Sequence, residues 1–233
     1  MDVSDREAED FYLQAVKMSE PRMLAEAASW LEESYGKKLL ETIRSVVEEK
    51  GIDHVQCLAP TKVGPFGCRF INAFFRELHG VKVKRGCRFA VGERVVQTKN
   101  LYDDDEKIGA DIMNGFGGKV LETVEDTGAV KVKFESVPDP VWLTRGQSNG
   151  LELAYAMSVH KSQGLGFKNV ILSCFFDPSS KTMLSRKNIY TALTRAKEGL
   201  YVVGKKKAFE YAVANVSESS RKTNLSTLIE QAA

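Results

Sequence analysis

Short apolar runs that alternate with helix-forming segments are the feature that most constrains the fold of this chain. The runs are "HVQCLAP" (54–60), "LELAYAMS" (151–158), "NVILSCFF" (169–176) and "LYVVG" (200–204). Segments with apolar residues at helical spacing precede the first run and lie between the others. Strands that alternate with helices predict an α/β fold with a parallel sheet covered by helices on both faces.

The predicted helices cover residues 22–50, 68–80 and 185–199. Gly36 interrupts the first helix and Gly51 ends it, while Gly80 ends the second. The third segment, "SRKNIYTALTRAKEG", places Ile189, Leu193 and Ala196 on the inward face. The expected order is therefore helix, strand, helix, and then a second group of strands and helices after residue 150.

Residues 88–148 differ from both flanks. They contain short β-branched runs such as "GERVVQ" and "AVKVKF", punctuated by the turn sequences "NGFGG" and "EDTG". This pattern predicts a small antiparallel β-barrel inserted into the α/β domain, which divides the chain into 1–87, 88–148 and 149–233. The acidic run "DDDEK" (103–107) is expected to be a solvated loop rather than a metal site.

The amino-acid composition limits the kinds of function that this protein can have. The 33 Lys and Arg residues nearly balance 31 Asp and Glu residues, so a basic binding face would have to be local. The four cysteines form no C-x-x-C pair and there are only three histidines, which favours reduced thiols over a zinc site. The start of the chain is acidic and lacks an apolar signal segment, and no run is long enough to span a membrane. We therefore expect a cytoplasmic protein with no membrane partner.

Several catalytic motifs are absent from the sequence. No G-x-x-x-x-G-K-[ST] occurs, and "GFGGKV" (115–120) has neither the spacing nor the hydroxyl of a phosphate-binding P-loop. No G-x-S-x-G elbow is present either, so Ser158 and Ser162 are not expected to be hydrolase nucleophiles. The residues present do not form a self-contained active site.

The segment "SVHKSQG" (158–164) gathers hydrogen-bonding side chains at the end of a predicted strand. Ser158 is expected to cap the turn that follows, and Lys161 adds a positive charge. His160, Ser162 and Gln163 add further donors at the carboxyl edge of the sheet, where ligands bind in open α/β folds. This set suits a phosphodiester backbone. The alternative is a polar capped turn with a solvated lysine.

A second cluster lies in "NIYTALTRAK" (188–197). Asn188, Thr191 and Arg195 would share one face of the predicted helix. An arginine on a rigid helix can clamp a phosphate with two parallel hydrogen bonds. The alternative is an arginine in a surface ion pair. The parallel sheet is expected to bring this helix end to the same edge as Lys161.

Together, "AYAMSVHKSQG" resembles motif V and "IYTALTRAK" resembles motif VI of RecD-type superfamily 1 DNA helicases. Supporting similarity comes from "CLAPTKVGPFGCRFINAFF", "FAVGERVVQTKN" and "NGFGGKV", and it extends from about Phe11 to the tail "RKTNLSTL". In that family two RecA-like domains sandwich ATP, and the second carries a small SH3-like insert. The resemblance implies that this chain is the second RecA-like domain with its insert.

The resemblance also implies roles for individual residues. Contacts with single-stranded DNA would come from Ser158, His160, Lys161, Ser162 and Gln163. Arg195 would be the arginine finger on the γ-phosphate, and Gly164 would also contact the nucleotide. ATP with Mg²⁺ would be shared with an N-terminal RecA-like domain that supplies the P-loop. Where the family continues motif V with Ser-Glu, this chain has Leu165 and Gly166.

The resulting hypothesis is the C-terminal motor half of an ATP-dependent 5′-to-3′ DNA helicase, a fragment or split-gene product completed by a P-loop-bearing half in cis or in trans. The alternative is a non-enzymatic module, derived from a helicase, that binds single-stranded DNA or regulates another protein. These two hypotheses differ in whether Arg195 serves catalysis.

Overall fold

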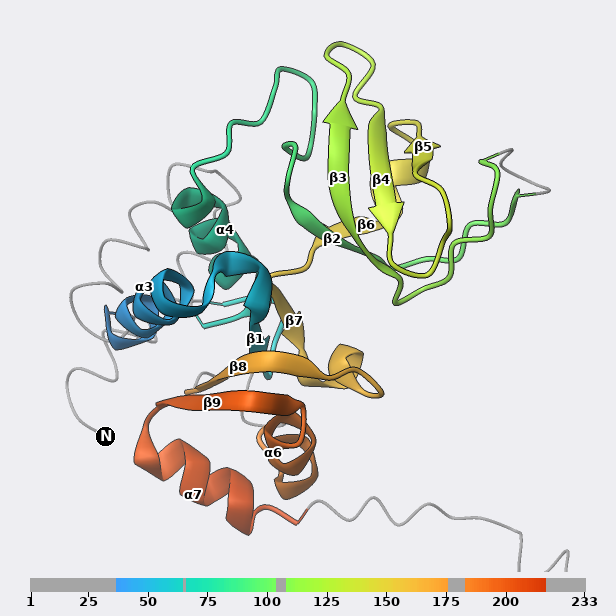
Figure 1. The fold of residues 1–233 in the computed structure, drawn as a ribbon. Helices are drawn as coiled ribbons and strands as arrows, with labels where there is room; N and C mark the ends of the chain where they lie inside the picture. The colour runs from blue at the N-terminus through green and yellow to red at the C-terminus, as the bar shows by residue number, and fades with distance from the viewer. Residues whose placement is uncertain (1–36, 65, 104–107, 176–182, 217–233) are drawn as a thin grey trace, which may run out of the picture.

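The computed structural model describes residues 37–64, 66–103, 108–175 and 183–216, and two β-sheets form its framework (Figure 1). The first sheet is parallel throughout, with strand order β7-β1-β8-β9. Its strands are β1 (Val55–Ala59), β7 (Ala156–Ser158), β8 (Phe167–Cys174) and β9 (Ala196–Gly204). The parallel sheet predicted from the alternating apolar runs is confirmed.

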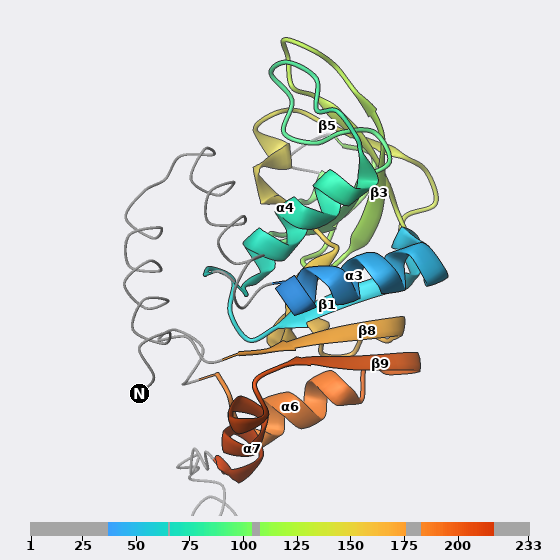
Figure 2. The same ribbon diagram turned by 90° about the vertical axis from the view of Figure 1, so that its left-hand side faces the viewer.

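Helices cover both faces of this sheet (Figure 2). On one side lie α3 (Lys37–Lys50) and α4 (Cys68–His79), and on the other lie α6 (Arg186–Leu193) and α7 (Lys206–Ala214). The residues of each strand alternate between the two cores, because successive side chains point to opposite faces. Cys57 packs in the core under α3 and α4, whereas the next residue, Leu58, packs against α6 and α7. We call this sheet and its helices the body.

The predicted helices agree with the structure at some ends and not at others. Gly80 ends α4 in the left-handed conformation, at φ 64°, as expected. Residues 22–36, with the predicted break at Gly36, lie outside the described residues. The third helix was predicted too long, because α6 ends at Leu193 and residues from Ala196 onward form strand β9. This stretch pairs with β8 and so belongs to the sheet. Arg195 therefore lies between the end of α6 and the start of β9.

The sequence suggested that the apolar run at 151–158 is one strand. In the structure it forms two strands. β6 (Leu151–Leu153) joins the antiparallel sheet, and β7 joins the parallel sheet. Between them Tyr155 is fully buried. The Asn72 amide holds the crossing in place by hydrogen bonds to the Leu153 carbonyl and to both backbone groups of Ala156.

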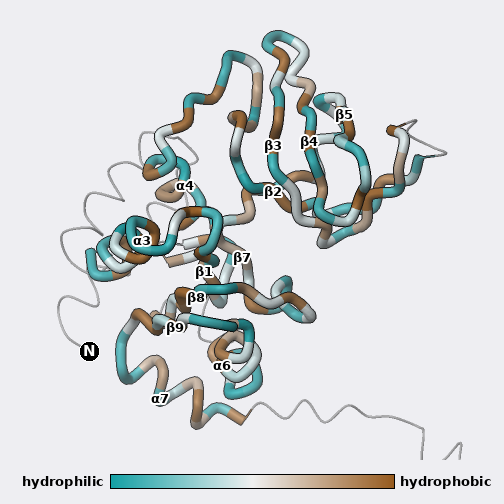
Figure 3. The backbone as a smooth tube through the Cα atoms, in the orientation of Figure 1, coloured by the Kyte–Doolittle hydropathy of each residue, from teal (hydrophilic) through white to brown (hydrophobic). Residues whose placement is uncertain are grey.

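The second sheet is antiparallel, with strand order β5-β4-β3-β2-β6. Its remaining strands are β2 (Arg94–Gln97), β3 (Gly117–Thr123), β4 (Val130–Phe134) and β5 (Val141–Leu143). Buried and half-buried residues alternate along β4, and polar and apolar stretches follow one another around this unit (Figure 3). Its separate core includes Val95, Val132 and Leu143. We call residues 88–153 the insert, because the sheet extends past the predicted boundary at 148; an SH3-like barrel stays a prediction.

Arg94 of β2 fastens the insert to the body. Its guanidinium donates hydrogen bonds to the carbonyl oxygens of Ile52 (3.2 Å), Val55 (2.9 Å) and Ala154 (3.2 Å) and to Oε1 of Gln56 (2.6 Å). The same group lies 5.4 Å from the centre of the Tyr155 ring. A second link is the ion pair between Arg76 of α4 and the fully buried Glu93. The two units are thus joined by buried charged contacts that require exact geometry.

Candidate nucleic-acid interface

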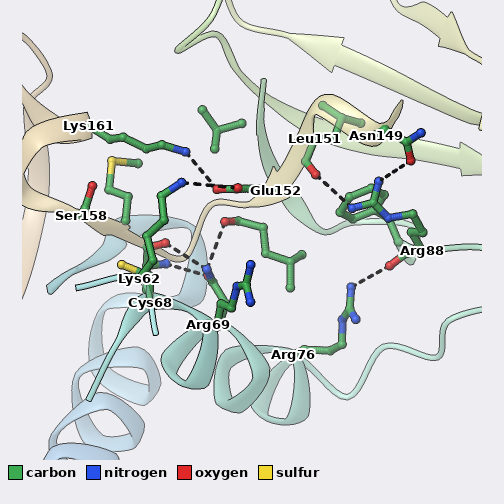
Figure 4. A pocket seen from close by; sticks show the side chains of 16 residues that line it. Lys62, Cys68, Arg69, Arg76, Arg88, Asn149, Leu151, Glu152, Ser158 and Lys161 are labelled. Atoms are coloured by element: carbon green, nitrogen blue, oxygen red, sulfur yellow. Dashed lines mark hydrogen bonds and ion pairs between the residues drawn. The ribbon is translucent and has the colours of Figure 1, made fainter. Parts of the chain in front are cut away.

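A cleft of about 540 Å³ lies where α4, the end of β7 and the insert meet (Figure 4). Its basic side chains are Lys62, Arg69, Arg76, Arg88 and Lys161. Glu152 is the one acidic residue among those that line it within the described part of the chain. The remaining lining residues include Ser158, Asn72 and Asn149, with apolar groups such as Val96 and Met157. The cleft therefore concentrates positive charge in a protein whose formal net charge is only +2.

Neighbouring parallel strands bring these residues together. β1 and β7 pair in register up to Ala59 and Ser158, so the loops that follow both strands leave from the same edge of the sheet. One loop carries Lys62, and the other forms the 3₁₀ turn η3 (Val159–Ser162), which carries Lys161. The insert contributes the third wall.

The polar face of α4 supplies the floor of the cleft. Arg69, Asn72 and Arg76 follow one another at helical spacing, so they project from one side of the helix. Ile71 and Phe75, on the opposite side, are fully buried in the core. The amphipathic character of this helix thus both anchors it to the sheet and turns two arginines toward the cleft.

Glu152 partly neutralises the cleft. Its Oε2 lies 2.9 Å from Nζ of Lys161, and its Oε1 lies 3.8 Å from Nζ of Lys62. Burial raises the pKa of this carboxyl, but the hydrogen bond and charge of Lys161, followed by the charges of Lys62 and Arg69, outweigh it. The net pKa of Glu152 is below its usual range, so the group is ionised at neutral pH.

The arginines of the cleft differ in how far their charges are compensated. Arg76 is paired with Glu93, through a 2.8 Å hydrogen bond from Nη2 to Oε2 and a second bond from Nε. Arg88 donates only to neutral oxygens, those of Ser148, Asn149 and Leu151. Arg69 has no ion-pair partner within 4 Å among the residues that the structure describes. Within the described part of the chain, neither Arg69 nor Arg88 is therefore held in a close ion pair, although the charge of Arg69 also acts on Glu152.

Cys68 also lines the cleft, but its thiol is not poised for chemistry. Its Sγ lies 3.2 Å from the carbonyl oxygen of Thr61. Burial raises the pKa of this thiol to about 12, so the nucleophilic thiolate is scarce at neutral pH. Cys57 and Cys174 are buried too, and Cys87 is half-buried.

The residues predicted from the motif-V-like segment separate into three groups. Ser158 and Lys161 line the cleft. His160 and Gln163 are exposed and do not line it. Ser162 is fully buried, and its hydroxyl donates a 2.7 Å hydrogen bond to the Val159 carbonyl, which gives it a structural part in the turn.

The expected cap at Ser158 is absent. Ser158 occupies the N-cap position of η3, but its side chain makes no capping hydrogen bond and faces the cleft instead. The sequence also missed Lys62, Arg69, Arg76 and Arg88. The spacing of Arg69, Asn72 and Arg76 on one helix face could have revealed two of these. The loop residues Lys62 and Arg88 carry no such periodic signal.

The sequence suggested that Arg195 and Lys161 lie at the same edge of the sheet. In the structure they lie at opposite edges. The residue after it, Ala196, pairs with Phe167 at the amino ends of β9 and β8. A helix that joins two parallel strands runs antiparallel to them, so its C-terminus returns to the amino edge. Lys161, by contrast, follows the carboxyl end of β7.

The Arg195 guanidinium is held by nearby groups of its own chain. Nε donates to the Thr191 carbonyl (3.0 Å), Nη1 to the Leu165 carbonyl (2.9 Å) and Nη2 to Oγ1 of Thr194 (3.1 Å). The contact with Leu165 joins Arg195 to the loop that follows η3. Asn188, which was expected to share a face with Arg195, instead donates its side-chain amide to the Met183 carbonyl.

The loop beside Arg195 contains Gly164, the last residue of the motif-V-like segment, and Gly166, which follows two residues later. Gly164 has a φ of 80°, and apart from its chain neighbours no atom of the described residues lies within 4 Å of where its Cβ would be. A Cβ on Gly166 would come within 2.6 Å of Cε of Lys197, so this lysine stem occupies the place beside Gly166. The edge therefore presents Arg195 and Lys197 with open backbone at Gly164.

The sequence of the chain was compared with known proteins. Residues 153–203 match the model of the UvrD-like helicase C-terminal domain. The chain is 33% identical over 179 residues to the ATP-dependent RecD2 DNA helicase of Deinococcus radiodurans, covering 75% of this chain and 23% of that protein. It is 31% identical over 123 residues to the RecBCD enzyme subunit RecD of Mycobacterium tuberculosis, covering 53% of this chain and 20% of that one.

The fold was also compared with solved structures. A crystal structure of the Pif1 helicase from Bacteroides, in complex with ADP-AlF₃ and single-stranded DNA, aligns over 93% of this chain and 54% of its own, with 18% identity and a TM-score of 0.45. The body is an α/β unit with a parallel sheet, and its sequence is similar to helicase C-terminal domains. More particularly, the chain is related to the C-terminal half of RecD-like superfamily 1 helicases, which confirms the resemblance inferred from the two motifs. It spans 23% and 20% of the two named relatives.

No helix in the described part of the chain has both the length and the apolar content needed to cross a membrane.

Proposed function

We propose that this chain is the C-terminal motor half of an ATP-dependent 5′-to-3′ DNA helicase that holds single-stranded DNA in the basic cleft and presents Arg195 to ATP. The observation that carries the proposal is the gathering of five basic side chains in one cleft beside the motif-V-like segment. Phosphate contacts of this kind supply most of the sequence-independent affinity of proteins for nucleic acids.

The cleft suits the sugar–phosphate backbone better than the bases. Arg69 and Arg88 form no close ion pair with the described residues, and Ser158 and Asn149 add hydrogen-bonding groups. Sequence-tolerant binding of bases needs an aromatic face to stack on. Phe89 is the aromatic residue that lines the cleft, and only 4% of it is exposed. Weak base preference and strong salt dependence therefore follow from the proposal.

The nucleotide part of the proposal rests on Arg195. Bound to phosphate, its guanidinium would exchange the bond to the Leu165 carbonyl for a γ-phosphate oxygen, at an edge where Lys197 adds a second positive charge. An arginine in this position stabilises charge that develops in the transition state. The P-loop lysine and the Mg²⁺ ligands would come from a RecA-like domain in cis or in trans, because these 233 residues contain no P-loop motif.

The proposal is tested first with the 233-residue polypeptide itself. We expect it to release no phosphate from ATP, with or without DNA, because an arginine finger alone does not assemble the transition state. We expect it to bind a fluorescein-labelled oligothymidine, with an affinity that falls steeply as salt is added. Robust ATP turnover that disappears in Arg195→Ala, or DNA binding that is indifferent to salt, contradicts the proposal.

A second assay separates the proposal from the non-enzymatic alternative. The chain is combined with a RecD-type domain that bears the P-loop, and DNA-stimulated phosphate release is measured. Turnover that requires both parts supports the motor half. Persistent DNA binding without any turnover in the combined sample supports the non-enzymatic module instead.

A further inference from the structure

The carboxylate of Glu152 lies among the basic side chains of a cleft that we propose to bind an anion. We propose that Glu152 is an acidic gate: it competes with DNA phosphates for Lys161 and Lys62 and thereby sets how tightly the cleft holds single-stranded DNA. This inference rests on the proposed function and identifies the residue that regulates that site.

The position of Glu152 supports this role. It lies on β6, opposite Val96 of β2, and so belongs to the insert. Lys161 and Lys62 lie on loops of the body. The two ion pairs, at 2.9 Å and 3.8 Å, therefore connect the two walls of the cleft (Figure 4). Each carboxylate oxygen lies near one lysine, so a phosphate that binds either lysine has to compete with the carboxylate.

The ion pairs are open enough to exchange. The Lys161 side chain is 28% exposed and the Glu152 side chain is 47% exposed. Ion pairs that solvent reaches contribute little stability, because water and salt screen both charges. Incoming phosphates can therefore take over the lysines while the carboxylate turns to solvent. This differs from the pair of Arg76 with Glu93, in which the acid is fully buried.

Two physical effects of Glu152 act in the same direction. The carboxylate occupies the two lysines, and it also repels any phosphate bound near Arg69, whose charge acts on the same carboxyl. Removing its charge while keeping its shape should therefore strengthen binding of every DNA sequence alike. Because the lysines are then free in the unbound protein, more counterions are released on binding, and the salt dependence becomes steeper.

The test compares variants of the full chain by fluorescence anisotropy with a labelled oligothymidine, between 50 and 200 mM salt. Glu152→Gln keeps the size of the side chain and removes its charge. We expect it to bind about fivefold to tenfold more tightly than the wild type. Its salt slope should be steeper by about 0.7 for each lysine released. Glu152→Asp, which keeps the charge, should stay within about twofold of the wild type.

Glu122→Gln is the matched control. Glu122 is an exposed glutamate on β3, opposite Lys131, and it does not line the cleft. Its loss changes the net charge by the same amount. An equal gain in affinity for Glu122→Gln would trace the effect to overall charge and overturn the gate. Melting temperatures of all variants establish that they are folded.

The remaining outcomes separate the gate from the cleft. Unchanged or weaker binding by Glu152→Gln, combined with weaker binding by Arg69→Ala, overturns the gate and leaves DNA in the cleft. DNA binding could also be unchanged in all three variants, Arg69→Ala, Lys161→Ala and Glu152→Gln. DNA then does not bind in the cleft, and both the gate and that part of the proposed function are wrong.

Discussion

The basic cleft and the Arg195 edge use positive charge in opposite ways. In the cleft, five basic residues come from two loops of the body, the helix α4 and the insert, and no single one dominates. At the other edge one guanidinium is held by three groups of its own chain. When the charge is distributed, each residue adds a small part of the affinity for a long polyanion. A fixed arginine instead suits a single phosphoryl group. Substitutions should accordingly cause small losses in the cleft and an all-or-none loss at Arg195.

One short segment serves both regions. Lys161 lies on η3 at the carboxyl edge of the sheet, and Leu165, four residues later, accepts the hydrogen bond from Arg195 at the amino edge. The predictions below use this separation, since a substitution at one end should leave the function of the other end intact.

The largest expected effect is that of Arg195→Ala on ATP turnover. In an assembly that contains the P-loop domain, we expect turnover to fall about a thousandfold or more, while nucleotide affinity changes far less. Arg195→Lys should rescue little, because an ammonium group does not reproduce the planar fork. Steady-state phosphate release and melting temperature are measured on the same preparation. Near-normal turnover in a folded Arg195→Ala variant would end the arginine-finger proposal, and a changed DNA affinity would contradict the separation of the two regions.

Within the cleft, Arg69 and Lys161 should differ. Arg69→Ala should weaken binding of single-stranded DNA about tenfold, because it removes a charge that is not held in a close ion pair among the described residues. Lys161→Ala should cost only about threefold, since Glu152 already holds this lysine. Fluorescence anisotropy over a salt series measures both. Lys187→Ala on α6 is the control, because this exposed lysine lies outside the cleft. Equal losses for Arg69→Ala and Lys161→Ala would show that Glu152 does not weaken Lys161.

Ser162→Ala should affect folding rather than DNA binding. The buried hydroxyl donates a hydrogen bond to the Val159 carbonyl, and losing this bond should cost about 1 kcal/mol in the free energy of unfolding. Chemical denaturation measures the loss, and anisotropy on the folded variant checks affinity. A large drop in DNA affinity with unchanged stability would restore the DNA-contact role that the family resemblance implied.

The smallest expected effect is the pH dependence of the stability that Glu152 provides. The folded-state pKa of this carboxyl is lowered, so its contribution is fully present above the unfolded value of 4.5 and is lost as the pH falls through the lower folded value. At neutral pH, Glu152→Gln should be less stable than the wild type by at most about 1 kcal/mol, because solvent screens the half-exposed ion pairs. Denaturation curves of both proteins should converge under acid conditions. A stability difference that persists below the folded pKa would contradict an electrostatic origin.

The sequence predicted the body better than the site. Buried strands such as β1 and β8 are rich in apolar residues, and this local composition makes them recognisable in the sequence. The division of residues 151–158 into β6 and β7 was not visible, because a strand that changes sheets has no local signature when both halves are apolar. The helix before Arg195 was extended too far for the same reason: pairing with β8 outweighed the helical pattern of "TRAKEG".

Site residues were predictable where a motif named them and unpredictable where the fold brought them together. Ser158 and Lys161 stood in a recognisable segment. Arg88 reaches the cleft from the insert, about 70 residues earlier in the chain, and only the tertiary structure reveals it. Ser162 shows the converse, since a motif residue proved to be buried in its own turn.

The hydrogen bonds of Arg94 to the body mean that the insert cannot be exchanged independently of the body. The arginine comes from the insert, but three of its four acceptors stand at Ile52, Val55 and Gln56, immediately before and within β1. A designer who replaced residues 88–153 with a short linker would leave these acceptors without their donor at the start of the strand on which the cleft depends. A truncated or grafted version of this protein, or an exchange between relatives, therefore has to keep Arg94 together with β1.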